Sequence, residues 1–329
     1  MIFVTGGTGF LGSYILQELV LQGRPVRALR RNLTVPFYMH PGLLDKISWV
    51  HGDILDVNGL MENMAGCDKI IHAAGMVSFN PSDKKKLFQL NIEGTANLVN
   101  AAIETGIADL VHVSSVSALG RHDDTTPIDE EKKWIGNDGQ SNYGISKYYS
   151  EMEVWRGMGE GLTPLIVNPS TLLGYGDWNQ TSCGLFKTAY RAFPWYTNGS
   201  NGFTDVRDTA RAIIALMDRG IRNERFIISA ENRTYREIFN WMAQGFGKKL
   251  PSKKAGPFFA GIAWRTEKLK SAFSRHKPLI TRESVAIASR RSTYDNRKLL
   301  KALPGFRFRS LEDSIFEACA GYGANPQPI

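Results

Sequence analysis

The chain has 329 residues, and 40 Lys and Arg residues against 32 Asp and Glu residues give it a formal net charge of +8. The excess of positive charge lies between Lys248 and Arg309, a segment with 17 basic and three acidic residues, so the rest of the chain is mildly acidic. A uniformly basic nucleic-acid-binding surface is therefore excluded. A hydrophobic fraction of 43% and a charged fraction of 22% exclude collagen-like and wholly disordered chains.

Short apolar runs alternate with amphipathic stretches through the first two-thirds of the chain. The apolar runs predict strands at residues 2–4, 26–29, 47–50, 69–72, 110–113 and 165–167. Apolar residues at three- and four-residue spacing predict helices at residues 11–21, 60–64, 87–104 and 143–158. A helix at 209–217 and a strand at 225–228 repeat the unit. Most strand runs are continuously apolar, which is typical of parallel strands covered on both faces, so we expect an α/β fold with a doubly wound, Rossmann-like parallel sheet.

The pattern changes after residue 230. A helix is expected at 235–246, followed by a break around Pro251 and Gly256 and then by short basic helices. No Ser/Gly/Pro-rich linker separates this part from the rest. We expect residues 1–167 and 203–229 to form one domain, and residues 168–202 and 230–329 to form a smaller, mostly helical C-terminal cap on the carboxyl edge of the sheet.

A glycine-rich turn, Thr-Gly-Gly-Thr-Gly-Phe-Leu-Gly, follows the first predicted strand. Its glycines suit a tight turn, a close approach of backbone N–H groups to a pyrophosphate, and close packing of helix on strand. A strand before it, a helix after it and a second strand ~20 residues on are the context of a dinucleotide site, whereas a turn without ligand is the alternative. The predicted cofactor contacts are Gly6, Thr8, Gly9, Phe10, Leu11 and Gly12.

Two arginines stand at the end of the second predicted strand. An NAD-binding fold places an Asp or Glu there to accept from the ribose 2′-OH, but this chain has Arg30 and Arg31. Guanidinium groups would instead bind a 2′-phosphate through charge-assisted hydrogen bonds, unless both are merely solvated. The sequence therefore predicts NADP(H) in preference to NAD(H).

Hydroxyl and amine groups lie in two later segments. Ser114 and Ser115 end a predicted strand, and Tyr143 and Lys147 share one face of a helix at i and i+4. With the glycine turn, this order of motifs resembles the extended short-chain dehydrogenases/reductases of the NAD(P)-dependent epimerase/dehydratase family, and especially their dihydroflavonol-reductase-like group. The further matching segments are Asp53, Ala73-Ala74-Gly75, Asn91, Asn168-Pro169-Ser170, Gly174-Tyr175-Gly176 and Val206-Arg207-Asp208.

The resemblance implies a role for each of these residues. Tyr143 would give a proton to the carbonyl oxygen in reduction, Lys147 would hold the nicotinamide ribose and lower the pKa of Tyr143, and Ser115 would hydrogen-bond the substrate oxygen. Further cofactor contacts would be Asp53 and Ile54 at the adenine, Ala73, Ala74, Gly75, Asn91 and Ser114 in the cleft, and Pro169 and Ser170 beside the nicotinamide. The expected substrate contacts are Met76, Ser78, Asn168, Trp178 and Phe186.

Three functions fit these motifs. The first is an NADPH-dependent oxidoreductase that reduces a ketone or aldehyde on a fairly apolar small molecule. A nucleotide-sugar epimerase with tightly bound nicotinamide is the second, with Asn168 and late arginines at the diphosphate. A non-catalytic, NADP-sensing binding protein is the third, although such proteins commonly lose the Tyr or the Lys. The aromatic group that includes Trp178 and Phe186 would line an apolar substrate pocket or form the core of the cap.

Several negative features limit the remaining possibilities. The three cysteines are far apart and the six histidines are scattered, so we expect no metal site and a reducing compartment. No signal peptide or membrane span is recognisable, which predicts a cytoplasmic protein, and the resemblance implies a homodimer. The basic segment would be a solvated face, an anion-recognition surface or a membrane-surface attachment with the apolar run at 258–264.

Overall fold

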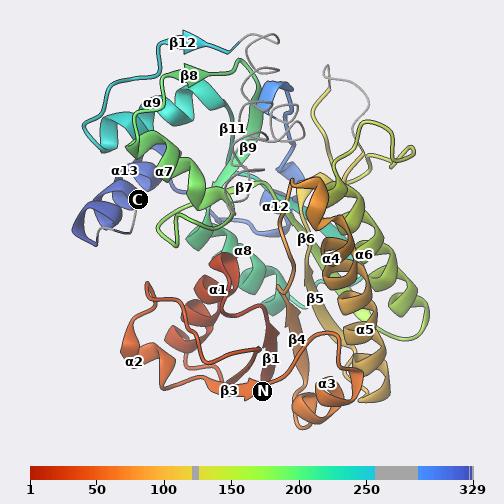
Figure 1. The fold of residues 1–329 in the computed structure, drawn as a ribbon. Coiled ribbons are helices and arrows are strands. Elements are labelled where there is room, and N and C mark those ends of the chain that lie inside the picture. The colour runs from red at the N-terminus through yellow and green to blue at the C-terminus, as the bar shows by residue number, and fades with distance from the viewer. Residues whose placement is uncertain (121–125, 256–287, 326, 328–329) are drawn as a thin grey trace.

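The central sheet has seven parallel strands in the order β10-β6-β5-β4-β1-β2-β3 (Figure 1). The computed structural model describes residues 1–120, 126–255, 288–325 and 327. The strands are β1 (Ile2–Thr5), β2 (Val26–Arg30), β3 (Ser48–His51), β4 (Lys69–His72), β5 (Asp109–Val113), β6 (Thr163–Pro169) and β10 (Glu224–Ile228). All their pairings are parallel, which confirms the predicted doubly wound sheet.

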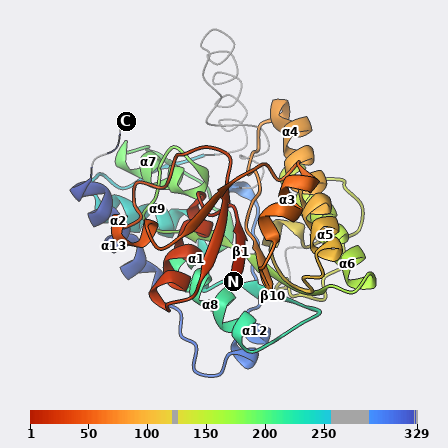
Figure 2. The ribbon, with the colours of Figure 1, turned by 90° about the horizontal axis from the view of Figure 1, so that it is seen from below.

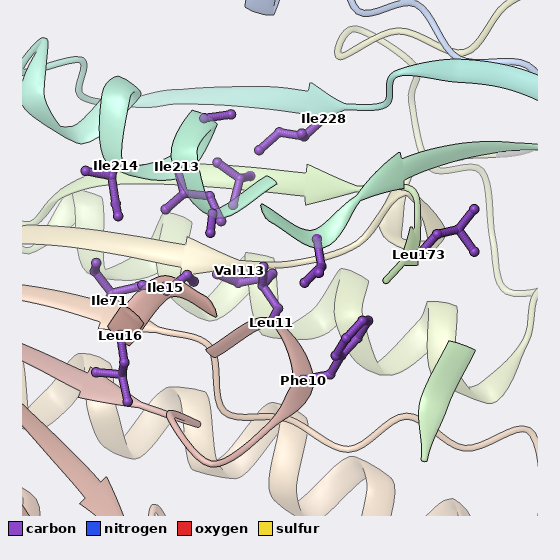
Figure 3. Close-up of a cluster of buried hydrophobic side chains, with 14 of the residues drawn as sticks. Phe10, Leu11, Ile15, Leu16, Ile71, Val113, Leu173, Ile213, Ile214 and Ile228 are labelled. Carbon is purple, nitrogen blue, oxygen red and sulfur yellow. The ribbon is translucent and has the colours of Figure 1, made fainter. Parts of the chain in front are cut away.

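Helices cover both faces of the sheet (Figures 1 and 2). On one face lie α1 (Phe10–Leu21) and α8 (Val206–Asp218), and on the other lie α3 (Val57–Met64), α5 (Gly94–Glu104) and α6 (Asn142–Gly159). Successive strand residues point to opposite faces, so Ile71 packs with Ile15 of α1 (Figure 3), while Ile70 packs with Leu98 of α5. This two-sided burial explains why the strands are continuously apolar.

The helix predicted at residues 87–104 is interrupted. It consists of α4 (Lys84–Phe88), a π-helical turn (Gln89–Glu93) and α5. The extra residue in the turn places the Asn91 side chain against the loop after β4, where it bonds to the backbone of Met76. Apolar spacing alone does not reveal this bulge, because its hydrogen bonds are to a distant part of the chain.

The cap combines helices with two small sheets. One sheet has the order β11-β9-β7 and the other pairs β12 with β8. Among the described cap helices the longest, α13, has Glu312 and Asp313 in its first turn and so is not one of the expected basic helices. The cap elements are β7 (Thr171–Leu173), α7 (Gly184–Tyr190), β8 (Trp195–Tyr196), β9 (Ser200–Asp205), β11 (Glu231–Thr234), α9 (Tyr235–Gly245), β12 (Lys253–Lys254), α12 (Arg297–Ala302) and α13 (Leu311–Ala324).

One hydrophobic core runs through sheet and cap. The same cluster holds Leu16 of α1, Phe186 of α7 and Ile315 of α13. The division into two domains stays a prediction. Short elements complete the described chain: α2 (Pro41–Leu44), and 3-10 turns at Pro81–Asp83, Val116–Ala118 and Thr181–Cys183.

Much of the basic segment lies outside the described residues. These exclude 256–287, and with them the apolar run at 258–264 and most of the expected late basic helices. The possible roles of this segment therefore stay predictions. Among the residues that are described, no helix is long and apolar enough to cross a membrane.

Candidate active site

The glycine turn brings the ends of β1 and β4 close together. Gly6 has φ of +74°, and a Cβ added there would come closer than 3.0 Å to backbone atoms of Ala73 and Ala74. A Cβ on Gly12 would likewise approach the carbonyl of Gly6, with its carbon at 2.7 Å. Both positions therefore require glycine for steric reasons, and together they form a cradle of bare backbone.

This cradle lies at the switch point of the sheet, because β1 has β4 on one side and β2 on the other. Helix α1 starts at Phe10, and its N-cap residue Gly9 contributes no side-chain hydrogen bond to the first turn. Phe10 and Leu11 are buried, so only their backbone N–H groups can face a ligand, whereas Thr8 is partly exposed. A helix N-terminus of this kind binds phosphate groups through its N–H donors and its dipole.

Arg30 is the last residue of β2 and lies over an aromatic ring. Its guanidinium carbon is 5.1 Å from the centroid of Trp49 on β3, an arrangement that favours one orientation of the side chain. Its carbonyl accepts a hydrogen bond from Gly52 at 3.1 Å. Arg31 follows and is exposed. No acidic side chain stands at the end of β2, where Arg30 and Arg31 supply two cations instead.

Asp53 and Ile54 follow β3. The Asp53 carboxylate accepts a hydrogen bond from Leu55 N at 3.0 Å and is only partly exposed. Ile54 is buried against the start of α5, where a Cβ on Gly94 would lie 2.9 Å from its Cγ2 atom. The structure therefore places both residues at the carboxyl edge, with Ile54 anchoring the loop.

Asn91 connects the loop after β4 to helix α6. Its Oδ1 accepts from Met76 N at 2.7 Å, and its Nδ2 donates to Met76 O and to Ser146 Oγ. It is 1% exposed, so its side chain acts on the loop that contains Ala73, Ala74 and Gly75 and is not open to a cofactor. In the same loop, Ser78 donates to Asp83 at 2.7 Å.

Ser115, Tyr143 and Lys147 meet at the carboxyl ends of the central strands. Ser115 follows β5, and its hydroxyl is hydrogen-bonded to Tyr143 and accepts from Ser117 N at 3.1 Å. Tyr143 lies in the first turn of α6, which Ser141 caps by accepting from Gly144 N. One turn later, Lys147 is buried and donates to the carbonyl of Val113 at 2.8 Å.

The pKa of Tyr143 is shifted upwards, opposite to the lowering expected from the motif. Burial raises it to about 12, and the hydrogen bond from Ser115 opposes the rise. Burial also lowers the pKa of Lys147 to about 8, although the carboxylate of Glu151 partly offsets this effect. Lys147 is engaged by Val113 and provides too little stabilisation of a phenolate to overcome desolvation.

Two buried histidines lie beneath this group, paired across β4 and β5. His72 bonds to Thr5 and Thr95 at 2.7 and 3.0 Å, and its ring centroid is 5.2 Å from that of His112. Burial lowers the pKa of His72 to about 3 and that of His112 well below its usual value, so both are neutral. They are structural, and the described residues contain no cluster of three or more metal-ligating side chains.

Three hydroxyls directly after strands of the central sheet have no partner within the described chain. Ser114 Oγ, Ser170 Oγ and Ser229 Oγ are buried and unbonded after β5, β6 and β10, and Pro169, the last residue of β6, is also buried. Buried hydroxyls without partners are rare in proteins, because each one costs the free energy of its lost hydration. The positions of Ser114 and Ser170 at the carboxyl ends of β5 and β6 fit contacts to a ligand bound there.

The substrate residues predicted from sequence do not form one group. Trp178 and Phe186 are 2% and 0% exposed and pack around Tyr322 in the cap, so the structure favours the core alternative for both. Asn168 is fully buried and bonds within the protein. Sequence analysis missed Phe79, whose ring meets that of Tyr143 edge-on at 5.8 Å. Only a contact between distant segments could have identified it.

Comparisons with known proteins agree with this arrangement. Residues 2–229 match the model of the NAD dependent epimerase/dehydratase family. A Synechocystis sp. protein provisionally named a dihydroflavonol 4-reductase is 32% identical, over 96% of this chain and 92% of its own length. Cinnamoyl-CoA reductase 2 of Arabidopsis thaliana is 25% identical, over 85% and 89%. Among solved structures, that of a protein named gox2253 has a TM-score of 0.82 at 28% identity, covering 99% of this chain and 98% of that one.

Proposed function

The chain belongs to the NAD-dependent epimerase/dehydratase family and is an NAD(P)-dependent enzyme of the extended short-chain dehydrogenase/reductase type. From this premise we propose that it uses NADPH to reduce a ketone or aldehyde on a fairly apolar small molecule. The observation that carries the proposal is the hydrogen-bonded pair of Ser115 and Tyr143, with Lys147 one turn along α6.

The carboxyl edge of the sheet suits a dinucleotide. Gly6 and Gly12 leave backbone bare where a pyrophosphate would approach, and the hydroxyls of Ser114 and Ser170 lack partners at the strand ends. When bound, the nicotinamide supplies the hydride. Arg30, oriented over Trp49, would bind the 2′-phosphate that distinguishes NADPH from NADH.

The protein's own groups handle the proton. As a carbonyl is reduced, negative charge grows on its oxygen, and Tyr143 gives its hydroxyl proton to that oxygen. Ser115 donates a hydrogen bond to the same oxygen and so stabilises the charge. Lys147, which donates to Val113 O, provides a positive charge that favours the phenolate left behind.

Apolar groups beside Tyr143 support an apolar substrate. The ring of Phe79 contacts that of Tyr143, and in the same loop Val77 is 43% exposed and Met76 is partly exposed. The names of two relatives, a dihydroflavonol 4-reductase and a cinnamoyl-CoA reductase, are those of reductases. A ring-bearing or aliphatic carbonyl compound would contact this loop while its oxygen met Tyr143 and Ser115.

The first experiment follows NADPH consumption with a panel of apolar ketones and aldehydes. Tyr143→Phe should lower kcat about 100- to 10,000-fold, the range for a lost general acid, without weakening NADPH binding. Tyr149→Phe, which alters an exposed tyrosine of the same helix, is the matched control and should behave as wild type. Wild-type turnover by Tyr143→Phe would refute the mechanism.

The second experiment compares cofactors. NADPH should bind at least about tenfold more tightly than NADH, a difference of ~1.4 kcal/mol, and Arg30→Asp should abolish the preference. Arg307→Asp makes the same charge change in an exposed loop residue beyond α12 and is the control. Equal binding of the two cofactors by the wild type would disprove the preference. Release of stoichiometric nicotinamide on denaturation, without NADPH consumption, would favour an epimerase instead.

A further inference from the structure

Glu151 is a fully buried carboxylate on the helix that carries Tyr143 and Lys147. It lies one turn beyond Lys147, and its side chain is 0% exposed. A buried carboxylate is costly unless it is paired and hydrogen-bonded. Glu151 is both: its Oε2 accepts from Arg225 Nη1 at 3.2 Å, and its Oε1 accepts from Asn168 Nδ2 at 2.6 Å.

Asn168 continues this chain of bonds to Ser115. The same Nδ2 atom that donates to Glu151 also donates to the Ser115 carbonyl at 2.9 Å. The network therefore runs from Arg225 on β10, through Glu151 on α6 and Asn168 on β6, to the residue after β5. Arg225 is held in turn by the carbonyl of Glu130. Four separate elements meet at a point with no exposed side chain except that of Arg225, which is 20% exposed.

The network restrains the backbone that presents the Ser115 hydroxyl. The Ser115 carbonyl accepts from Ala118 N at 2.9 Å as well as from Asn168, so it is held from two sides. Because Glu151 and Tyr143 are on the same helix, the bond through Asn168 ties Ser115 to the element that positions Tyr143. The distance between the two hydroxyls is then restrained by α6 as well as by the loop after β5.

We propose that Glu151 is a positioning residue that acts through Asn168 to keep the Ser115 hydroxyl at a fixed position relative to the Tyr143 hydroxyl. This inference rests on the proposed function and adds to it two residues that act through the protein. Asn168 was expected at the substrate; both hydrogens of its amide group are committed to Ser115 and Glu151, and only its buried Oδ1 has no partner in the described chain. Asn168 therefore links the position of Glu151 to that of the Ser115 backbone. Misplacing a reacting group by ~1 Å can lower the rate about 100-fold.

Glu151 also acts on Lys147 through its charge. The titratable groups around Lys147 are Glu151 and Tyr143 on α6, His72 on β4 and His112 on β5. Glu151 raises the pKa of Lys147, whereas burial lowers it to about 8, and both histidines are neutral. Loss of the carboxylate should therefore move the alkaline limb of the pH–rate profile to lower pH.

The test is a double-mutant cycle with Glu151→Gln and Asn168→Ala. Each single variant should lower kcat about tenfold or more while the Kd for NADPH changes less than about twofold, and the double variant should be no slower than the slower single one. Asp208→Asn, which neutralises another fully buried carboxylate beside arginines, is the control. It should lower the Tm without lowering kcat.

Hydrogen exchange supplies a readout that needs no turnover. Glu151→Gln should raise the exchange rate of the amides at 115–119, which Asp208→Asn should leave unchanged. Wild-type kcat in Glu151→Gln, or independent and multiplying effects in the double variant, would overturn the proposal. If the wild type reduced no carbonyl compound, the proposed function would fail, and unchanged exchange at 115–119 would then overturn the positioning role separately.

Discussion

Substitution of Gly12 by alanine tests the cofactor cradle most directly. The added Cβ would lie 2.7 Å from the carbonyl carbon of Gly6, whereas ordinary van der Waals contact begins at 3.4 Å. The turn and α1 must therefore separate by at least about 0.7 Å, the difference between these two distances. Gly6 is itself packed closely against the backbone of Ala73 and Ala74, which restricts its movement.

A shift of this size has two calculable consequences. A donor moved by ~0.7 Å from an ideal ~2.9 Å ends ~3.6 Å from its acceptor, which is outside hydrogen-bonding range. Loss of two charge-assisted bonds to a pyrophosphate, at ~1.5–3 kcal/mol each, would weaken NADPH binding at least about 100-fold. Overpacking itself costs ~1–3 kcal/mol, which lowers the Tm of a chain of this length by only a few degrees.

Binding and stability are measured separately, by titration of NADPH fluorescence and by thermal unfolding. Gly159→Ala is the matched control, because a Cβ near the end of α6 would meet nothing within 4 Å. That variant should bind NADPH as the wild type does and unfold at no lower temperature. If Gly12→Ala bound NADPH within about threefold of the wild type, the steric reasoning about the cradle would be wrong.

Three further predictions concern the surroundings of the site. Trp49→Ala should weaken NADPH binding about two- to fivefold and leave NADH binding unchanged, because the substitution removes a cation–π contact worth ~0.5–1 kcal/mol from Arg30. Equal losses of affinity for both cofactors would argue against this role of Arg30. The kcat/KM for NADPH should fall as pH rises through about 8, since Lys147 is charged only below its lowered pKa, and a flat profile from pH 7 to about 9.5 would contradict this role. The pKa of His72 is about 3 when folded and 6.5 when unfolded, so the unfolded chain binds the extra proton between these values and stability is lost as pH falls below 6.5. His72→Gln should therefore reduce the slope of unfolding free energy against pH by up to ~1.4 kcal/mol per unit, as measured by urea unfolding.

Local patterns in the sequence were sufficient to predict the parallel sheet and its glycine-rich turn. Continuous apolar runs predict strands buried on both faces, and all seven predicted strands form the sheet. Gly6 and Gly12 are recognisable because the positive φ of Gly6 and its close approach to Gly12 arise within one strand–turn–helix unit, whereas the contact of Gly6 with Ala73 and Ala74 does not. Tyr143 and Lys147 are likewise paired by helical spacing alone.

Contacts between distant segments decided the features that the sequence analysis did not predict. The π-helical turn at Asn91 exists because its side chain bonds to Met76, and Phe79 reaches Tyr143 only in the folded chain. The cap sheets are short strands whose partners lie far away along the chain, so local propensity does not specify them. Trp178 and Phe186 show the same limit, because an aromatic cluster has the same sequence signal in a core as at a pocket wall.

The sequence by itself determined which chemistry this protein carries, and the tertiary structure decided how the groups are held. The motifs that bind and react are local, since a turn or a helix face places their residues together whatever the rest of the chain does. The link from Glu151 through Asn168 to Ser115 joins residues on three elements, and its bonds exist only after the sheet has assembled. Burial is also a tertiary property, and it gives Tyr143 a raised pKa where the motif alone predicts a lowered one.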